Sequence, residues 1–147
     1  MKENIICSGA LFYSTSTKRF LFLQRTDAKT QGTWGLVGGL ARNTESAFEG
    51  LKREIEEEVG DTPKYKKVIP LEMFTSNDQK FYFHTYLIAI DGEFIPKLNE
   101  EHSGYCWCAF ECWPKNLHGG LRNTLNNKSI KGKLQTCLLY TSDAADE

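Results

Sequence analysis

The apolar positions of this 147-residue chain follow two periods, one of two residues and one of three to four. A period of two is typical of strands, and a period of three to four is typical of helices. Residues 79–90 give the clearest strand pattern, with apolar side chains on both faces. Residues 20–23 form a short continuous apolar run, which indicates a strand covered on both faces. The predicted strands are 4–13, 20–23, a short strand leading into Gly38, 65–75, 79–90 and 105–110.

A single amphipathic helix is predicted over residues 46–59. Ser46 followed by Glu49 has the spacing of a capping box, and Gly60 supplies a residue that can end a helix in the left-handed conformation. Apolar residues at helical spacing give this helix one buried face: Phe48, Leu51, Ile55 and Val59. A weaker helix is predicted from Leu121 onward, interrupted by Gly132. Helices packed on a largely β chain predict an α/β sandwich.

Pro70 affects the position that we expect for the strand 65–75. Proline cannot donate a hydrogen bond to a neighbouring strand, so this strand should lie at a sheet edge or be interrupted. A polar stretch at residues 99–104 is predicted as the loop before the strand 105–110.

Composition argues against a membrane-spanning, secreted or disulfide-rich protein. An apolar fraction of 40% in a chain of this length is enough for one core, and no apolar run has the length of a membrane span. The N-terminal residues lack a signal-peptide pattern, and five cysteines indicate reduced thiols rather than a disulfide framework. We therefore expect a soluble cytoplasmic protein. A net charge of −1 gives no reason to expect a membrane or a nucleic-acid polymer as partner.

The C-terminal segment Cys137–Glu147 has a different origin in our interpretation. It resembles the translation of a sequencing adapter read through at the end of a fragment, although an ordinary polar tail is the alternative. We therefore expect residues 1–136 to form a single, C-terminally truncated domain. We expect residues 137–147 to contribute nothing to fold or activity.

Three carboxylates of the predicted helix lie close together. Glu54, Glu57 and Glu58 have i, i+3 and i+4 spacing, so they share one strip of the helix surface. Like charges at this spacing repel, and acidic residues near a helix C-terminus oppose the helix dipole. A hard divalent cation with oxygen ligands would relieve both effects. A solvated face, with Arg53 offsetting part of the repulsion, is the alternative.

The spacing of residues around this strip resembles the signature of the Nudix hydrolase family. The matching positions are Gly39, Glu45, the run Arg53-Glu54-Ile55, the pair Glu57-Glu58, and Gly60. Two positions depart from the common pattern, since Asp61 replaces an aliphatic residue and Val37 stands where many members have proline. The resemblance implies an α/β/α sandwich with a mixed β-sheet.

The resemblance also implies an activity. Nudix hydrolases cleave a pyrophosphate bond in a nucleoside diphosphate linked to another moiety, and they use Mg²⁺ or Mn²⁺. The expected partner is thus a small-molecule nucleoside diphosphate derivative, and a homodimer is left open. The alternative is a catalytically inactive Nudix domain that binds a nucleotide or has a regulatory role.

Roles for individual residues follow from the same resemblance. The metal ligands would be Glu54, Glu57, Glu58 and the Gly38 carbonyl, and the base would be Glu54, Glu100 or Glu101. The residues that would support the site are Gly39, Glu45, Arg53 and Gly60. Arg25 and Lys29 precede the signature and either reach substrate phosphates or lie in a solvated loop.

A zinc site near the C-terminus is a further possibility to weigh. Cys106, Cys108 and Cys112 lie near His102 and His118, but their spacing is not that of a standard zinc pair. Because Cys106 and Cys108 are two apart on a predicted strand, they share a face, and we expect small buried apolar residues there.

Overall fold

The computed structural model describes residues 4–144, which form a seven-stranded mixed sheet between helices. The sheet order is β3-β2-β1-β6-β5, with β4 paired to β1 and β7 paired to β2. The elements are β1 (Ile5–Ser14), β2 (Arg19–Arg25), β3 (Trp34–Gly35), β4 (Val37–Leu40), α1 (Ala47–Val59), β5 (Lys67–Thr75), β6 (Phe81–Ile90), β7 (His102–Ala109), α2 (Gly119–Asn126) and α3 (Lys128–Ala144). The sheet is mixed because β1 and β6 run parallel while its other pairs are antiparallel.

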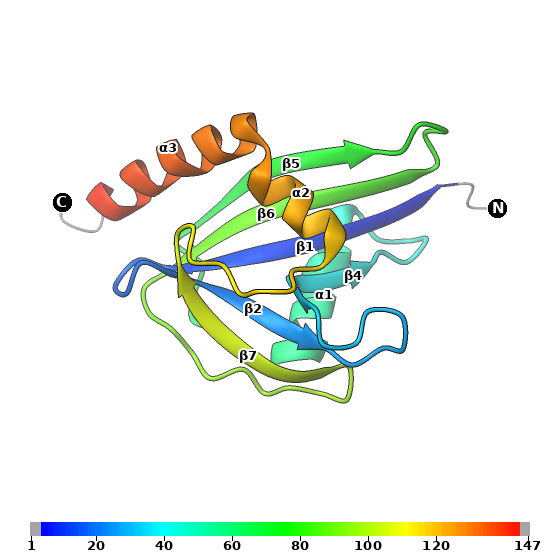
Figure 1. Cartoon of the computed structure of the whole chain (residues 1–147), viewed down its shortest axis with the longest axis horizontal. Helices are drawn as coiled ribbons and strands as arrows, with labels where there is room; N and C mark the ends of the chain where they lie inside the picture. The colour runs from blue at the N-terminus through cyan, green and yellow to red at the C-terminus, as the bar shows by residue number, and fades with distance from the viewer. Residues whose placement is uncertain (1–3, 145–147) are drawn as a thin grey trace.

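Helices cover both faces of this sheet, as Figure 1 shows, with α1 on one face and α2 and α3 on the other. Alternation along β1 places Ala10 and Phe12 in the core beneath α1. Leu11 and Tyr13 lie in the second core, beneath α2 and α3. The predicted α/β/α sandwich with a mixed sheet is therefore confirmed, because the central strands supply apolar side chains to two cores.

The strands β1 and β2 separate along their length. They pair only at one end, through Tyr13 with Phe20 and Ser14 with Arg19. The chain from residue 34 to 40 fills the space between them, because β3 pairs with β2 and β4 pairs with β1. This crossing aligns Gly38 with Gly9 of β1.

Gly38 has no room for a side chain at this crossing. Its φ is 157°, and a Cβ there would collide with the Ser8 carbonyl oxygen of β1. The backbone of β4 can therefore approach β1 closely, and this approach brings the β4 amides alongside α1.

Helix α1 forms as its capping pattern predicts. The Ser46 side chain accepts a hydrogen bond from the Glu49 amide at 3.1 Å, and the Glu49 carboxylate accepts one from the Ser46 amide at 2.8 Å. Gly60 follows the last turn with φ of 77°, a conformation that favours glycine. Gly50 lets the helix approach β4, since a Cβ there would lie 2.9 Å from Ala41.

Two predicted boundaries differ from the structure by three residues or more. Strand β7 begins at His102 rather than 105, because Arg25 and Gln24 of β2 pair with His102 and Gly104 across an irregularity in the ladder. The C-terminal helical region breaks at Asn127 rather than Gly132. The Asn127 side chain accepts a hydrogen bond from the Ile130 amide at 3.1 Å and so caps the start of α3.

The edge position expected from Pro70 is confirmed. Strand β5 is the last strand of the sheet order, and its pairing with β6 is irregular between Pro70 and Glu72. Among the described helices, none combines the length and apolar character needed to cross a bilayer.

Helix α3 continues into the segment 137–147. Cys137 and Leu138 are partly buried against the second core, next to the fully buried Leu134. Leu139 and Tyr140 are about two-thirds exposed, at 66% and 67%. The remainder of the segment is described only as helical backbone to Ala144, and residues 145–147 lie outside the described residues. The separate origin of the segment stays a prediction. The expectation that the segment contributes nothing to the fold does not hold for Cys137 and Leu138, because both pack against the second core.

Two truncations separate the residues that pack from those that do not. Deleting residues 139–147 should change the free energy of unfolding by less than about 0.5 kcal/mol, because the described side chains removed are exposed. Deleting residues 137–147 should cost about 1–2 kcal/mol, because the Leu138 contact is lost. Urea unfolding of both variants measures the difference. Equal stability of the two would mean that Cys137 and Leu138 are not part of the core.

Candidate active site

Glu58 is the most buried carboxylate described, with a relative exposure of 2%. It lies in the last turn of α1 and accepts a hydrogen bond from the Gly38 amide at 3.0 Å. Burial, together with the nearby carboxylates of Glu54 and Glu101, raises the pKa of Glu58 to about 9, although the hydrogen bond from the Gly38 amide acts to lower it. Three carboxylates therefore meet at the junction of α1 with β4.

Glu54 lies one turn earlier on α1 and contacts the other glycine of β4. A Cβ on Gly39 would collide with the Glu54 carboxylate, so glycine makes room for this side chain. Glu54 also pairs with Arg53, whose Nη1 lies 2.8 Å from its Oε1. The two glycines thus serve different purposes. Gly38 lets β4 lie close to β1, and Gly39 leaves space for the Glu54 carboxylate.

Arg53 joins the helix to the loop that precedes it. Its Nε and Nη2 bind the two oxygens of Glu45 at 2.8 and 3.0 Å, and Nη2 also donates to the Leu40 carbonyl at 3.0 Å. The hydrogen bonds from Arg53, together with one from the Arg42 amide, hold the pKa of Glu45 at about 2. The structure therefore brings Glu45, Arg53 and the Leu40 carbonyl together, and the supporting role of the two side chains stays a prediction.

Glu57 is more exposed than the other two helix carboxylates. It is 46% exposed, and its oxygens lie 3.2 Å from Arg53 and 4.0 Å from Arg42. Within the described residues, no three His, Cys, Asp or Glu side chains are arranged to hold a metal ion. As hard oxygen donors, the carboxylates fit a divalent cation, but Glu57 would have to leave Arg53 to join Glu54 and Glu58.

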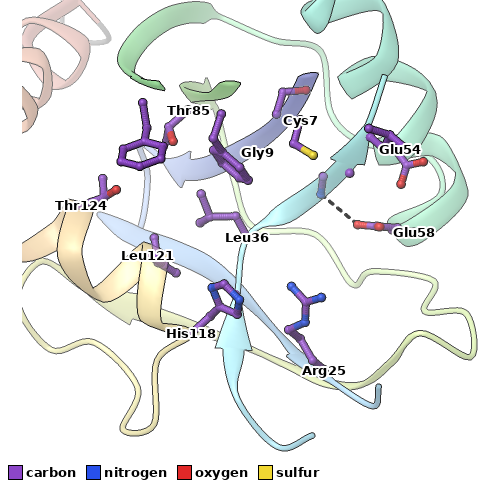
Figure 2. A pocket seen from close by; sticks show the side chains of 18 of the residues that line it. Cys7, Gly9, Arg25, Leu36, Glu54, Glu58, Thr85, His118, Leu121 and Thr124 are labelled. Atoms are coloured by element: carbon purple, nitrogen blue, oxygen red, sulfur yellow. Dashed lines mark hydrogen bonds between the residues drawn. The ribbon is translucent and has the colours of Figure 1, made fainter. Parts of the chain in front are cut away.

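One cavity of about 940 Å³ opens beside these carboxylates. At the carboxylate end its lining includes Gly38, Gly39, Glu54, Glu58, Glu100 and Glu101. Figure 2 shows Arg25 and His118 along the same wall, between the carboxylates and α2. Arg25 forms an ion pair with Asp27 at 3.0 Å, whereas Lys29 is exposed and does not line the cavity.

Glu101 is linked to α1 and acts on the charge of Glu58. The charge of Glu101 contributes to the raised pKa of Glu58. Asn99 ties this loop to α1, donating to the Glu57 carbonyl at 3.1 Å and to the Glu101 carboxylate at 3.3 Å. The loop before β7 thus carries Glu101 to the helix.

The cysteines of β7 lie apart from this site. The sulfurs of Cys106 and Cys108 are 3.6 Å apart on the second core, and burial raises the pKa of Cys106 to about 12. Their shared face is confirmed. His102 and His118 instead line the cavity, a location that their sequence positions beside the cysteines did not indicate.

Comparison with known proteins gives a consistent assignment. A family model described as the NUDIX domain matches residues 6–127. Nudix hydrolase 6 of Arabidopsis thaliana is 36% identical over 63 residues, which are 42% of this chain and 22% of that protein. The match thus spans about a fifth of that relative's length.

Two solved structures have the same fold. The MutT protein of Methanosarcina mazei Go1 has 25% identity and a TM-score of 0.67, over 90% of this chain and 96% of that one. An Ap4A hydrolase of C. elegans has 19% identity and a TM-score of 0.68, over 90% of this chain and 98% of that one.

Replacing Arg53 by lysine should loosen the junction of helix and loop. Lysine keeps the charge but cannot donate to Glu45, Leu40 and Glu54 together. We expect the melting midpoint to fall by roughly 5 °C, as calorimetry would measure. Arg42→Lys is the control, because the Arg42 side chain is 67% exposed and its one ion pair, with Glu57, is long at 4.0 Å. A midpoint for Arg53→Lys equal to that of the control would show that Arg53 does not brace this region.

Proposed function

This chain belongs to the NUDIX family, and on that premise we propose that it hydrolyses a pyrophosphate bond in a nucleoside diphosphate linked to another moiety. We propose Mg²⁺ or Mn²⁺ as its cofactor. The observation that carries the proposal is the meeting of Glu54, Glu58 and Glu101 at one end of a cavity of about 940 Å³. Ligand pockets fall in the range of roughly 300–1,000 Å³.

The proposed metal ligands are Glu54, Glu57, Glu58 and the Gly38 carbonyl. The Gly38 amide already orients the buried Glu58 carboxylate, and Arg53 orients Glu54. A bound divalent cation would neutralise charge on the phosphates and lower the pKa of a coordinated water. Arg25 lines the same cavity and would donate to a substrate phosphate, a role for which Lys29 is less well placed.

We propose Glu101 as the general base among the three candidates. Glu54 already accepts a hydrogen bond from Arg53 at 2.8 Å, which commits its carboxylate to an ion pair. Glu101 has an amide donor from Asn99 at 3.3 Å and lies near Glu58. Its carboxylate would take the proton from the attacking water as the oxygen of that water bonds to phosphorus. The bond from that phosphorus to the bridging oxygen would break, and the bridging oxygen would leave with the other phosphate.

A nucleotide panel tests this function directly. Nucleotide sugars, dinucleoside polyphosphates and nucleoside triphosphates are incubated with Mg²⁺ and then with Mn²⁺, and the products are identified. Metal-dependent cleavage of a pyrophosphate bond is expected. Binding without cleavage of any compound would support the alternative, an inactive nucleotide-binding module, although the signature carboxylates are all present in this chain.

Neutralising the helix carboxylates should abolish most activity. Glu58→Gln and Glu57→Gln each remove a charge that would hold the cation, and we expect a loss of about 10²–10³ in turnover with the fold retained. Glu56→Gln is the control, because Glu56 is exposed on α1 and does not line the cavity. Turnover and melting midpoint are measured for all three variants. Wild-type turnover in Glu57→Gln, or an equal loss in Glu56→Gln, contradicts the proposed ligand set.

The two carboxylates before β7 should differ in effect. We expect Glu101→Gln to lower kcat by about 10²-fold or more with little change in KM, because the base acts on the chemical step. Glu100→Gln should change kcat by less than about threefold, which is much less than the loss expected when the general base is removed. Steady-state kinetics on the best substrate separates them. A larger loss in Glu100→Gln would assign the base to Glu100 instead.

A further inference from the structure

The cavity continues away from the carboxylates into a second part between α2 and the sheet. Figure 2 shows Thr85, Leu121 and Thr124 there, with Leu36 between them and Glu58. We call this part the distal arm and define it by Leu36, Glu72, Phe83, Thr85, Leu121 and Thr124. None of these residues belongs to the catalytic roles proposed above, so the arm needs its own explanation.

Thr85 is a buried polar side chain that faces the arm. It is 4% exposed and it lines the cavity. A hydroxyl that lines a cavity is available to donate a hydrogen bond to a molecule bound there. Thr85 therefore offers a hydrogen bond to a polar atom of a molecule in the arm.

Glu72 lies beside Thr85 and presents an acceptor. The two residues are paired across β5 and β6, so their side chains share the face that α2 covers. Thr124 of α2 donates to Oε1 of Glu72 at 2.6 Å, which fixes the carboxylate, and no described donor binds Oε2. An ionised carboxylate only accepts hydrogen bonds, so this group selects for donors.

The walls of the arm favour a flat group. Leu36 and Phe83 lie over Gly9 of β1, where an added Cβ would meet both side chains at 3.2 Å. The Phe83 ring is followed by Phe81, with the centroids 6.5 Å apart. Leu121 closes the α2 side with 8% exposure. Aromatic and aliphatic surfaces with a few polar groups at one edge are complementary to a planar heterocycle.

We propose that the distal arm binds the base of the substrate, and that Glu72 selects a base with two adjacent N–H donors, as guanine has. The two guanine donors would face the Glu72 carboxylate, and the Thr85 hydroxyl would donate to the neighbouring carbonyl oxygen. Adenine presents a ring nitrogen lone pair where guanine presents a donor, so it would repel the carboxylate. This inference rests on the proposed function, because a nucleotide must occupy the cavity.

Calorimetric titration of nucleoside monophosphates into the metal-free protein tests the inference. It measures binding affinity and does not depend on turnover. We expect GMP to bind roughly tenfold or more tightly than AMP, and ribose 5-phosphate to bind more weakly than either. Glu72→Gln should remove most of the preference, because an amide offers one donor and one acceptor and suits adenine. Glu56→Gln is the matched control and should keep the preference. Thr85→Val should weaken GMP binding several-fold and is decisive if Glu72→Gln does not fold.

Equal affinity for GMP and AMP, or an unchanged preference in Glu72→Gln, overturns the inference. Its failure is distinct from failure of the proposed function. If nucleotides are hydrolysed without discrimination between bases, the function stands and the role of Glu72 falls. If no nucleotide is hydrolysed but GMP binds with a Glu72-dependent preference, the base site stands and the hydrolase proposal falls.

Discussion

The hydrogen bond from the Gly38 amide to the Glu58 carboxylate joins the two elements on which the site depends. It requires β4 to lie against β1, which only a residue without a Cβ permits at position 38. It also requires the last turn of α1 to bury a carboxylate, which costs free energy unless that carboxylate is hydrogen-bonded. The positions of Glu54 and Arg53 follow, because both lie on the same helix and contact the β4 segment.

The carboxylates of α1 and its preceding loop do not share one cationic partner equally. Arg53 binds oxygens of Glu45, Glu54 and Glu57, so part of the negative charge of the helix is already neutralised. Glu58 has no such cation, and its carboxylate is the one with the strongly raised pKa. The arginine thus divides the acidic strip into a structural side, towards Glu45, and a side open to the cavity.

Much of the fold follows from local signals in the sequence. Ser46, Glu49 and Gly60 specify the ends of α1 through hydrogen bonds within a few residues, and Pro70 indicates an edge strand because of its missing donor. The start of β7 could not be predicted, since it depends on pairing with Arg25 of β2. The family signature indicated the carboxylates, but Glu72, Thr85 and Thr124 carry no local pattern. They meet only because β5, β6 and α2 pack together.

The parallel pairing of β1 with β6 determines when this scaffold can form. It joins Ile5 to Phe81 and Ser14 to Ile90, so the central pair of the sheet closes a loop that contains β2, β4 and α1. Closing a loop of this length costs chain entropy before the contacts repay it, which slows folding. During synthesis the N-terminal strand therefore remains without its central partner until β6 has left the ribosome. The carboxylate helix is made before β6, and it gains the Ile88 and Ile90 part of its buried surroundings only with that strand.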